Sequence, residues 1–138
     1  MLAKKTIDEY KVLQGQYATN GFVVVMQVGI FYKIIGYKNN CEEISSKIRI
    51  KCLSDNNYKH CGFPTSALDK YLGRLILNEY NVVVFQYDEM EKGKRKLLIQ
   101  VKNGGKNCSY NRKILSVNGV DSSKVRKVSE GPTLFTSG

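Results

Sequence analysis

Gly21-Phe22-Val23-Val24-Val25-Met26-Gln27-Val28-Gly29-Ile30-Phe31-Tyr32-Lys33-Ile34-Ile35-Gly36 is the stretch that decides the fold of this 138-residue chain. The segment from Phe22 to Val28 is rich in β-branched and aromatic residues and too apolar for an exposed strand, so it predicts a central strand. The segment from Ile30 to Ile35 continues as a second strand, with a hairpin or a bulge at Gly29.

Helical patterns lie on both sides of this stretch. Thr6-Ile7-Asp8-Glu9 has the form of a capping box with Thr6 as the N-cap, and apolar residues at three- and four-residue steps then predict a helix to about Tyr17. A short helix is expected from Asn39 to Ser46, capped by Asn39 or Asn40. The strongest helical pattern opens at Pro64-Thr65 and is expected to end near Asn78.

Five further segments and a turn complete the predicted elements. Alternation predicts a half-buried strand from Lys47 to Leu53, and a turn follows from Ser54 to Asn57. Other strands are expected at Val82 to Phe85, Lys94 to Val101, Arg112 to Val117 and Lys124 to Val128. This order predicts an α/β (α+β) fold, a mixed β-sheet flanked by helices. We expect one module over residues 1–130, with a basic β-rich part from about residue 92, and a loose tail over 131–138.

Positive charge is concentrated near the C-terminus. The chain has 22 Lys and Arg against 12 Asp and Glu, a formal net charge of +10. Eleven of the basic residues but only one acid, Asp121, lie between Lys92 and Lys127, so the rest of the chain sums to zero. Such a field favours a polyanionic partner, nucleic acid first and an acidic membrane surface second.

The sequence lacks the common motifs of enzyme active sites and metal sites. There is no phosphate-binding loop and no nucleophile elbow, and the single histidine leaves little for acid–base catalysis. No C-x2-C pair exists, so the four cysteines are expected to be reduced thiols without metal. A non-enzyme without cofactors is the prediction. A metal-dependent nuclease using Asp88, Glu89 and Glu91 is the weaker alternative to a solvated loop.

Nothing in the sequence predicts a membrane span or a secretory signal. The longest apolar run is far shorter than the ~20 residues that a spanning helix needs. The start of the chain has no apolar segment before the first helical pattern. We therefore expect a cytoplasmic protein with no membrane partner.

Phe31 and Tyr32 should face opposite ways, because side chains alternate along a strand. Their size alone would favour the core for both. Val28-Gly29-x-Phe31-Tyr32 followed by Gly36 resembles the motif of the N-terminal mismatch-recognition domain (domain I) of MutS-type DNA mismatch repair proteins. Gly62-Phe63-Pro64 and the helix after it are similar to a Gly-Val-Pro segment and helix of that family, and the strand from Tyr80 to Gln86 resembles the next one.

The resemblance implies a non-enzymatic module that binds mismatched or distorted duplex DNA, alone or as part of a larger repair protein. Phe31 would be the wedge that enters the minor groove, Tyr32 would face the core, and Lys33 stands where the family has a glutamate. Lysine cannot accept a hydrogen bond from a base and adds attraction to phosphate. The expected DNA-binding residues are therefore Phe31, Lys33, Lys94, Arg95, Lys96, Lys102, Lys106, Arg112 and Lys113. The alternative is a protein-interaction domain that kept the fold, with Phe31 packed inside.

Overall fold

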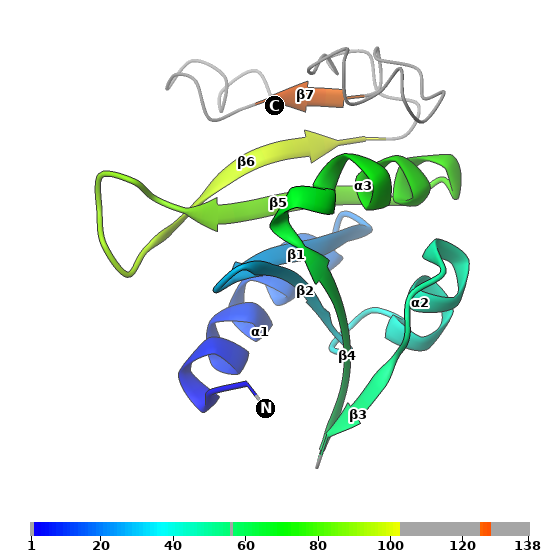
Figure 1. Ribbon diagram of the computed structural model, residues 1–138, viewed down its shortest axis with the longest axis horizontal. Helices are drawn as coiled ribbons and strands as arrows, with labels where there is room; N and C mark the ends of the chain where they lie inside the picture. The colour runs from blue at the N-terminus through cyan, green and yellow to red at the C-terminus, as the bar shows by residue number, and fades with distance from the viewer. Residues whose placement is uncertain (1, 56, 103–124, 128–138) are drawn as a thin grey trace.

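A seven-stranded mixed sheet organises the described part of the chain (Figure 1). The computed structural model describes residues 2–55, 57–102 and 125–127, the last of these by backbone only. The strand order is β3-β4-β2-β1-β5-β6-β7. The elements are α1 (Lys4–Ala18), β1 (Phe22–Val28), β2 (Phe31–Ile35), α2 (Cys41–Ile48), β3 (Leu53–Asp55), β4 (Tyr58–Pro64), the 3-10 turn η1 (Thr65–Ala67), α3 (Leu68–Leu77), β5 (Asn81–Tyr87), β6 (Arg95–Val101) and β7 (Val125–Lys127).

β1 lies at the centre of the sheet, as its apolar sequence predicts. It runs parallel to β5 and antiparallel to β2, and the remaining neighbours pair antiparallel. Only Gly29 and Ile30 separate β1 from β2. Gly29 has a φ of +62°, which a glycine adopts without strain at the first position of a two-residue hairpin turn.

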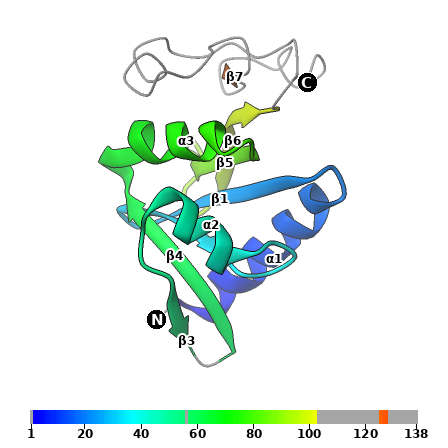
Figure 2. The same cartoon turned by 90° about the vertical axis from the view of Figure 1, so that its right-hand side faces the viewer.

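Two apolar cores cover the two faces of the sheet. Helices α2 and α3 pack on one face, where Tyr32, Ile34 and Phe63 meet Ile44 and Leu72. Helix α1 packs on the other face, against alternate residues of the same central strands (Figure 2). The sheet is therefore buried on both faces around β1, and its edges and strand ends carry the exposed side chains.

β2 pairs with only the last part of β1, and side chains replace the missing strand. The ladder joins Met26–Val28 of β1 to Phe31–Lys33 of β2, whereas β2 pairs with β4 along its whole length, Phe31–Ile35. At the vacated edge of β1, the buried Gln14 of α1 donates to the Phe22 carbonyl (2.8 Å) and accepts from the Val24 N–H (3.0 Å). The Tyr10 hydroxyl donates to the Val24 carbonyl (2.7 Å).

Asn39 joins this polar cluster to β2. Its amide nitrogen donates to Gln14 (2.8 Å), to the Tyr10 hydroxyl (3.1 Å) and to the Ile35 carbonyl (2.9 Å). The strong burial of Tyr10 raises the pKa of its phenol far above its usual value, so the hydroxyl keeps its proton. Hydrogen-bonded side chains thus replace strand pairing along the first part of β1, where β2 does not pair with it.

Several sequence predictions are confirmed, and others are wrong for identifiable reasons. The hairpin strands, α3, the Asn40 cap of α2 and the strand near Lys124 to Val128 are present, the last as β7. The capping box at Thr6 is wrong, because α1 begins earlier at Lys4 and its N-cap, Ala3, makes no side-chain bond. Leu2 extends the structure by packing in the α1-side core and donating its N–H to the Tyr58 hydroxyl (3.3 Å).

The predicted strand from Lys47 to Leu53 is also wrong. Helix α2 continues to Ile48, which lies four residues after Ile44 on its buried face, and Arg49 ends the helix with a φ of +62°. The strand begins only at Leu53, the last residue of the predicted strand, and continues through Asp55 into the predicted turn. It pairs with β4, which the sequence patterns did not predict. The predicted strand Arg112 to Val117 and the predicted tail over 131–138 lie outside the described residues.

Replacing Gln14 tests the polar cluster of Tyr10, Gln14 and Asn39 beside the unpaired part of β1. In Gln14→Leu, the Phe22 carbonyl and the Val24 N–H lose their partners inside the protein, so we expect a loss of about 2–4 kcal/mol of unfolding free energy. Urea unfolding followed by circular dichroism measures it. The matched control, Gln16→Leu on the exposed side of the same helix, should change stability by less than about 0.5 kcal/mol. Equal effects of the two substitutions would contradict this role.

Candidate functional site

The β1–β2 hairpin tip presents apolar side chains to solvent. Phe31 is 40% exposed and Ile30 is 73% exposed, whereas Tyr32 is 4% exposed and packs against Phe63. Alternation along β2 therefore separates the two aromatics as predicted, and the expectation from size that both are buried is wrong for Phe31. We use "hairpin tip" for residues Gly29 to Lys33.

Lys33 lies beside Phe31 on the same face of the sheet. Its ammonium nitrogen is 5.4 Å from the centre of the Phe31 ring, a favourable cation–π distance. Its stem crosses Gly62, the residue opposite it in β4. A Cβ at Gly62 would lie 2.7 Å from the Lys33 Cδ and 2.8 Å from the Tyr32 carbonyl oxygen. Glycine at this position thus makes room for the lysine.

Nearby titratable groups add no positive charge next to Lys33. Burial lowers the pKa of His60, and the positive charge of Lys33 lowers it further. The imidazole is therefore neutral at neutral pH and adds no positive charge. Burial also raises the pKa of Tyr32, so that phenol stays protonated. The tip combines an exposed aromatic ring with one adjacent ammonium group.

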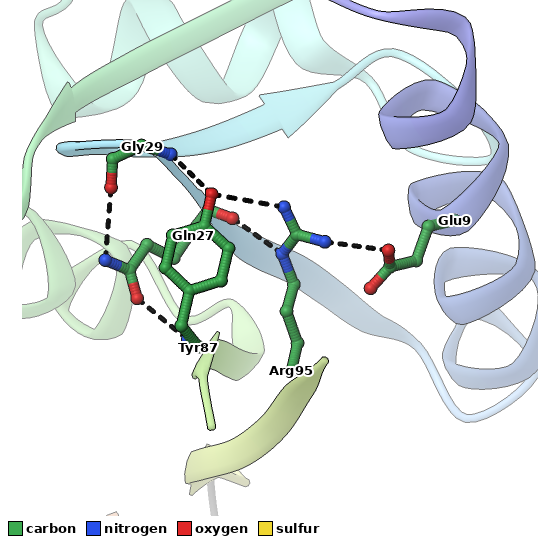
Figure 3. Close-up of polar contacts among 5 residues, drawn as sticks. All are labelled: Glu9, Gln27, Gly29, Tyr87 and Arg95. Carbon is green, nitrogen blue, oxygen red and sulfur yellow. Dashed lines mark hydrogen bonds and ion pairs between the residues drawn. The ribbon is translucent and has the colours of Figure 1, made fainter. Parts of the chain in front are cut away.

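Hydrogen bonds hold the hairpin tip from both sides. On the β4 side, the Thr65 N–H donates to the Ile30 carbonyl (2.9 Å). On the β5–β6 side, the Gly29 N–H donates to the Tyr87 hydroxyl (2.6 Å), and the Gln27 amide donates to the Gly29 carbonyl (3.1 Å) (Figure 3). The tip is therefore fixed by elements far from it in sequence.

The other predicted binding residues lie in three different places. Lys94 is exposed on the loop between β5 and β6, where it pairs with Glu91 (3.3 Å). Arg95 is inside the protein, with its side chain only 8% exposed and paired with Glu9 (2.7 Å). Lys96 is half-buried on β6, and Lys102 is exposed just beyond the other end of that strand. Lys106, Arg112 and Lys113 lie outside the described residues.

The acidic residues proposed for a nuclease do not converge on a metal site. Asp88 accepts from the Met90 N–H (2.8 Å), and Glu91 is paired with Lys94. Within the described ranges, no group of three His, Cys, Asp or Glu side chains is placed to hold a metal ion. Cys41 and Cys61 are buried free thiols with sulfurs 3.8 Å apart, and Cys52 is a half-buried one.

A known protein family matches most of the chain. The family model of MutS domain I matches residues 5–119. The chain belongs to the MutS domain I family. The family is that of a non-catalytic DNA-binding module for mismatch recognition, and the resemblance seen in the sequence is confirmed. No curated protein matches the chain. In the described part of this MutS domain I protein, no helix is long and apolar enough to cross a membrane.

Sequence reasoning missed the residues that support the tip. Ile30, Gln27, Tyr87 and Glu9 carry no motif, and Glu9 reaches this site through its bond to Arg95, 86 residues away. The one local signal was alternation in Lys94-Arg95-Lys96, because consecutive strand residues cannot all face solvent on one side. It indicates that one of the three points elsewhere, but only the fold shows that Arg95 turns inward.

Filling the space at Gly62 tests the packing under Lys33. In Gly62→Ala the new methyl group meets the Tyr32 carbonyl oxygen, which is backbone and can yield only by shifting β2 from β4. We expect a loss of about 1–3 kcal/mol, measured by urea unfolding. The matched control is Gly15→Ala within α1, where a Cβ meets nothing within 4 Å. It should gain about 0.5–1 kcal/mol from helix propensity. Unchanged stability of Gly62→Ala would refute the close packing.

Proposed function

We propose that this protein binds mismatched or distorted duplex DNA, with Phe31 as the wedge and lysines as contacts to phosphate. The exposure of Phe31 on a hairpin tip held from both sides is the observation that carries the proposal. An apolar wedge must be exposed before binding and must keep its position while it separates stacked bases. Unstacking costs a few kcal/mol and costs least where a mismatch already weakens the stack, so a rigid wedge selects defects.

Lys33 gives the tip a different chemistry from the glutamate of the family motif. An ammonium group donates hydrogen bonds and accepts none, so it cannot receive an N–H from an unstacked base. Its place beside the Phe31 ring favours contact with a phosphate next to the insertion point. We therefore infer that Lys33 strengthens binding without reading the identity of the base.

Lysines beyond the tip supply the remaining attraction to DNA. Lys94 is exposed on the β5–β6 loop, and Lys96 follows it on β6. The loop lies on the side of the molecule toward which β1 and β5 point (Figure 1). Lys102, Lys106, Arg112 and Lys113 continue the positive charge along the sequence. Lysine contacts phosphate as a point charge, so affinity should depend strongly on salt and weakly on sequence.

The alternative functions have less support. A protein-interaction domain that lost DNA contact was expected to pack Phe31 inside, and the ring is exposed. The nuclease would need Asp88 and Glu91 free to bind metal, and both are engaged within their own loop. DNA recognition by the hairpin tip accounts for the exposed ring and the basic charge together.

Removing the wedge tests the proposal directly. We expect Phe31→Ala to weaken binding to a mismatched duplex about 5- to 150-fold, the usual effect of losing one base-stacking aromatic, and to change binding to a perfect duplex little. Fluorescence anisotropy with labelled duplexes at fixed salt measures both. Leu77→Ala, an exposed apolar residue at the end of α3, is the matched control and should leave both affinities unchanged. Absence of DNA binding by the wild-type protein at low salt would reject the proposal.

Neutralising Lys33 separates its contribution to overall DNA affinity from discrimination between mismatched and perfect duplexes. Lys33→Gln should weaken binding to mismatched and perfect duplexes by similar factors and reduce the slope of log affinity against log salt by about one, as expected for one lost phosphate contact. The control is Lys51→Gln, an exposed lysine between α2 and β3, which should leave the slope unchanged. A loss confined to the mismatched duplex would show instead that Lys33 contacts the base.

A further inference from the structure

Arg95 is bound by the protein itself on every side of its guanidinium. Its Nε donates to the Gln27 carbonyl (2.7 Å) and its Nη1 to the Glu9 carboxylate (2.7 Å) (Figure 3). Its Nη2 is 3.5 Å from the Tyr87 hydroxyl, and the guanidinium lies 4.8 Å from the centre of the Tyr87 ring. With its side chain 8% exposed, Arg95 is poorly placed to reach a phosphate.

The same contacts lead to the backbone of the hairpin tip. The Tyr87 hydroxyl that faces Arg95 accepts from the Gly29 N–H. Gln27, whose carbonyl accepts from Arg95, uses its side-chain amide to hold the Gly29 carbonyl and the Tyr87 N–H (2.8 Å). Both backbone polar groups of Gly29 are therefore fixed by partners of Arg95, and Phe31 follows Gly29 by two residues.

We propose that Arg95 is a positioning residue that aims the Phe31 wedge, and not a phosphate contact. This inference rests on the function proposed above. Arg95 joins α1, through Glu9, to the β1–β2 tip and to the start of β6, so three elements hold one turn. Its planar fork can donate in three directions at once, which a lysine ammonium at this place would not reproduce with the same geometry. Through these hydrogen bonds, the buried Arg95 guanidinium fixes the direction of the exposed Phe31 ring.

Positioning and phosphate contact predict opposite results for variants. Arg95→Lys keeps the charge but removes the fork. If Arg95 positions the wedge, this variant should lower the ratio of mismatched to perfect duplex affinity toward one and leave the salt slope unchanged. Lys94→Gln, its neighbour on the exposed loop, should behave in the opposite way, with a slope lower by about one and an unchanged ratio. Tyr87→Phe, which removes only the hydroxyl that accepts from Gly29, should repeat the Arg95→Lys result in a fold left intact.

Hydrogen exchange of the Gly29 amide, measured by NMR without DNA, provides the second readout. We expect exchange to be about tenfold faster in Tyr87→Phe and in Arg95→Lys, since a protecting hydrogen bond is lost or misplaced. Unchanged Gly29 exchange in both variants would overturn the inference, as would an Arg95→Lys protein that keeps its mismatch ratio. Faster exchange together with a wild-type protein that does not discriminate mismatches would overturn the proposed function and support the link from Arg95 to the tip.

Discussion

The polar cluster of Tyr10, Gln14 and Asn39 is the interaction on which the rest of the structure depends. A central strand with one bare edge would leave buried backbone groups without partners, at a cost of about 1–3 kcal/mol each. Side chains from α1 and from the segment before α2 satisfy the groups at Phe22 and Val24. β2 can therefore pair with β1 over only three residues while it pairs with β4 along its whole length, and Phe31 to Lys33 of the hairpin tip pair with both strands.

The short ladder makes the hairpin tip dependent on distant contacts. Only three residues of β1 pair with β2, so the β1–β2 ladder itself supplies few bonds to the turn. Thr65 supplies a bond from the β4 side, and Tyr87 with Gln27 supplies bonds from the β5 side. An exposed aromatic side chain on this turn thus receives a fixed direction from the whole sheet and not from its own hairpin.

Local sequence patterns were enough to predict those elements in which the spacing of apolar residues matches the residues that are buried. The apolar run of β1, the glycine turn, the Asn40 cap and the spacing of α3 each carried their own signal. β4 carried little, since His60, Gly62 and Pro64 interrupt its alternation, and its strand state follows from pairing with β2. The segment from Ile44 to Ile50 fits helical and strand spacing alike, and only packing decides between them. The family motif led to Phe31, but the support from Glu9, Gln27 and Tyr87 could not be read locally.

Arg95 shows why a count of charges overstates a binding surface. In the sequence it sits between Lys94 and Lys96 and looks like part of one basic cluster, yet Glu9 neutralises it inside the protein. Inserting a ring between bases pushes back on the hairpin tip with the energy of unstacking, a few kcal/mol. A turn held only by a short ladder would be displaced by this opposing force. A turn that is also hydrogen-bonded to residues linked to α1, β5 and β6 would keep its position. In the function proposed here, the charge that looks most available for DNA is thus the one that supports the proposed wedge.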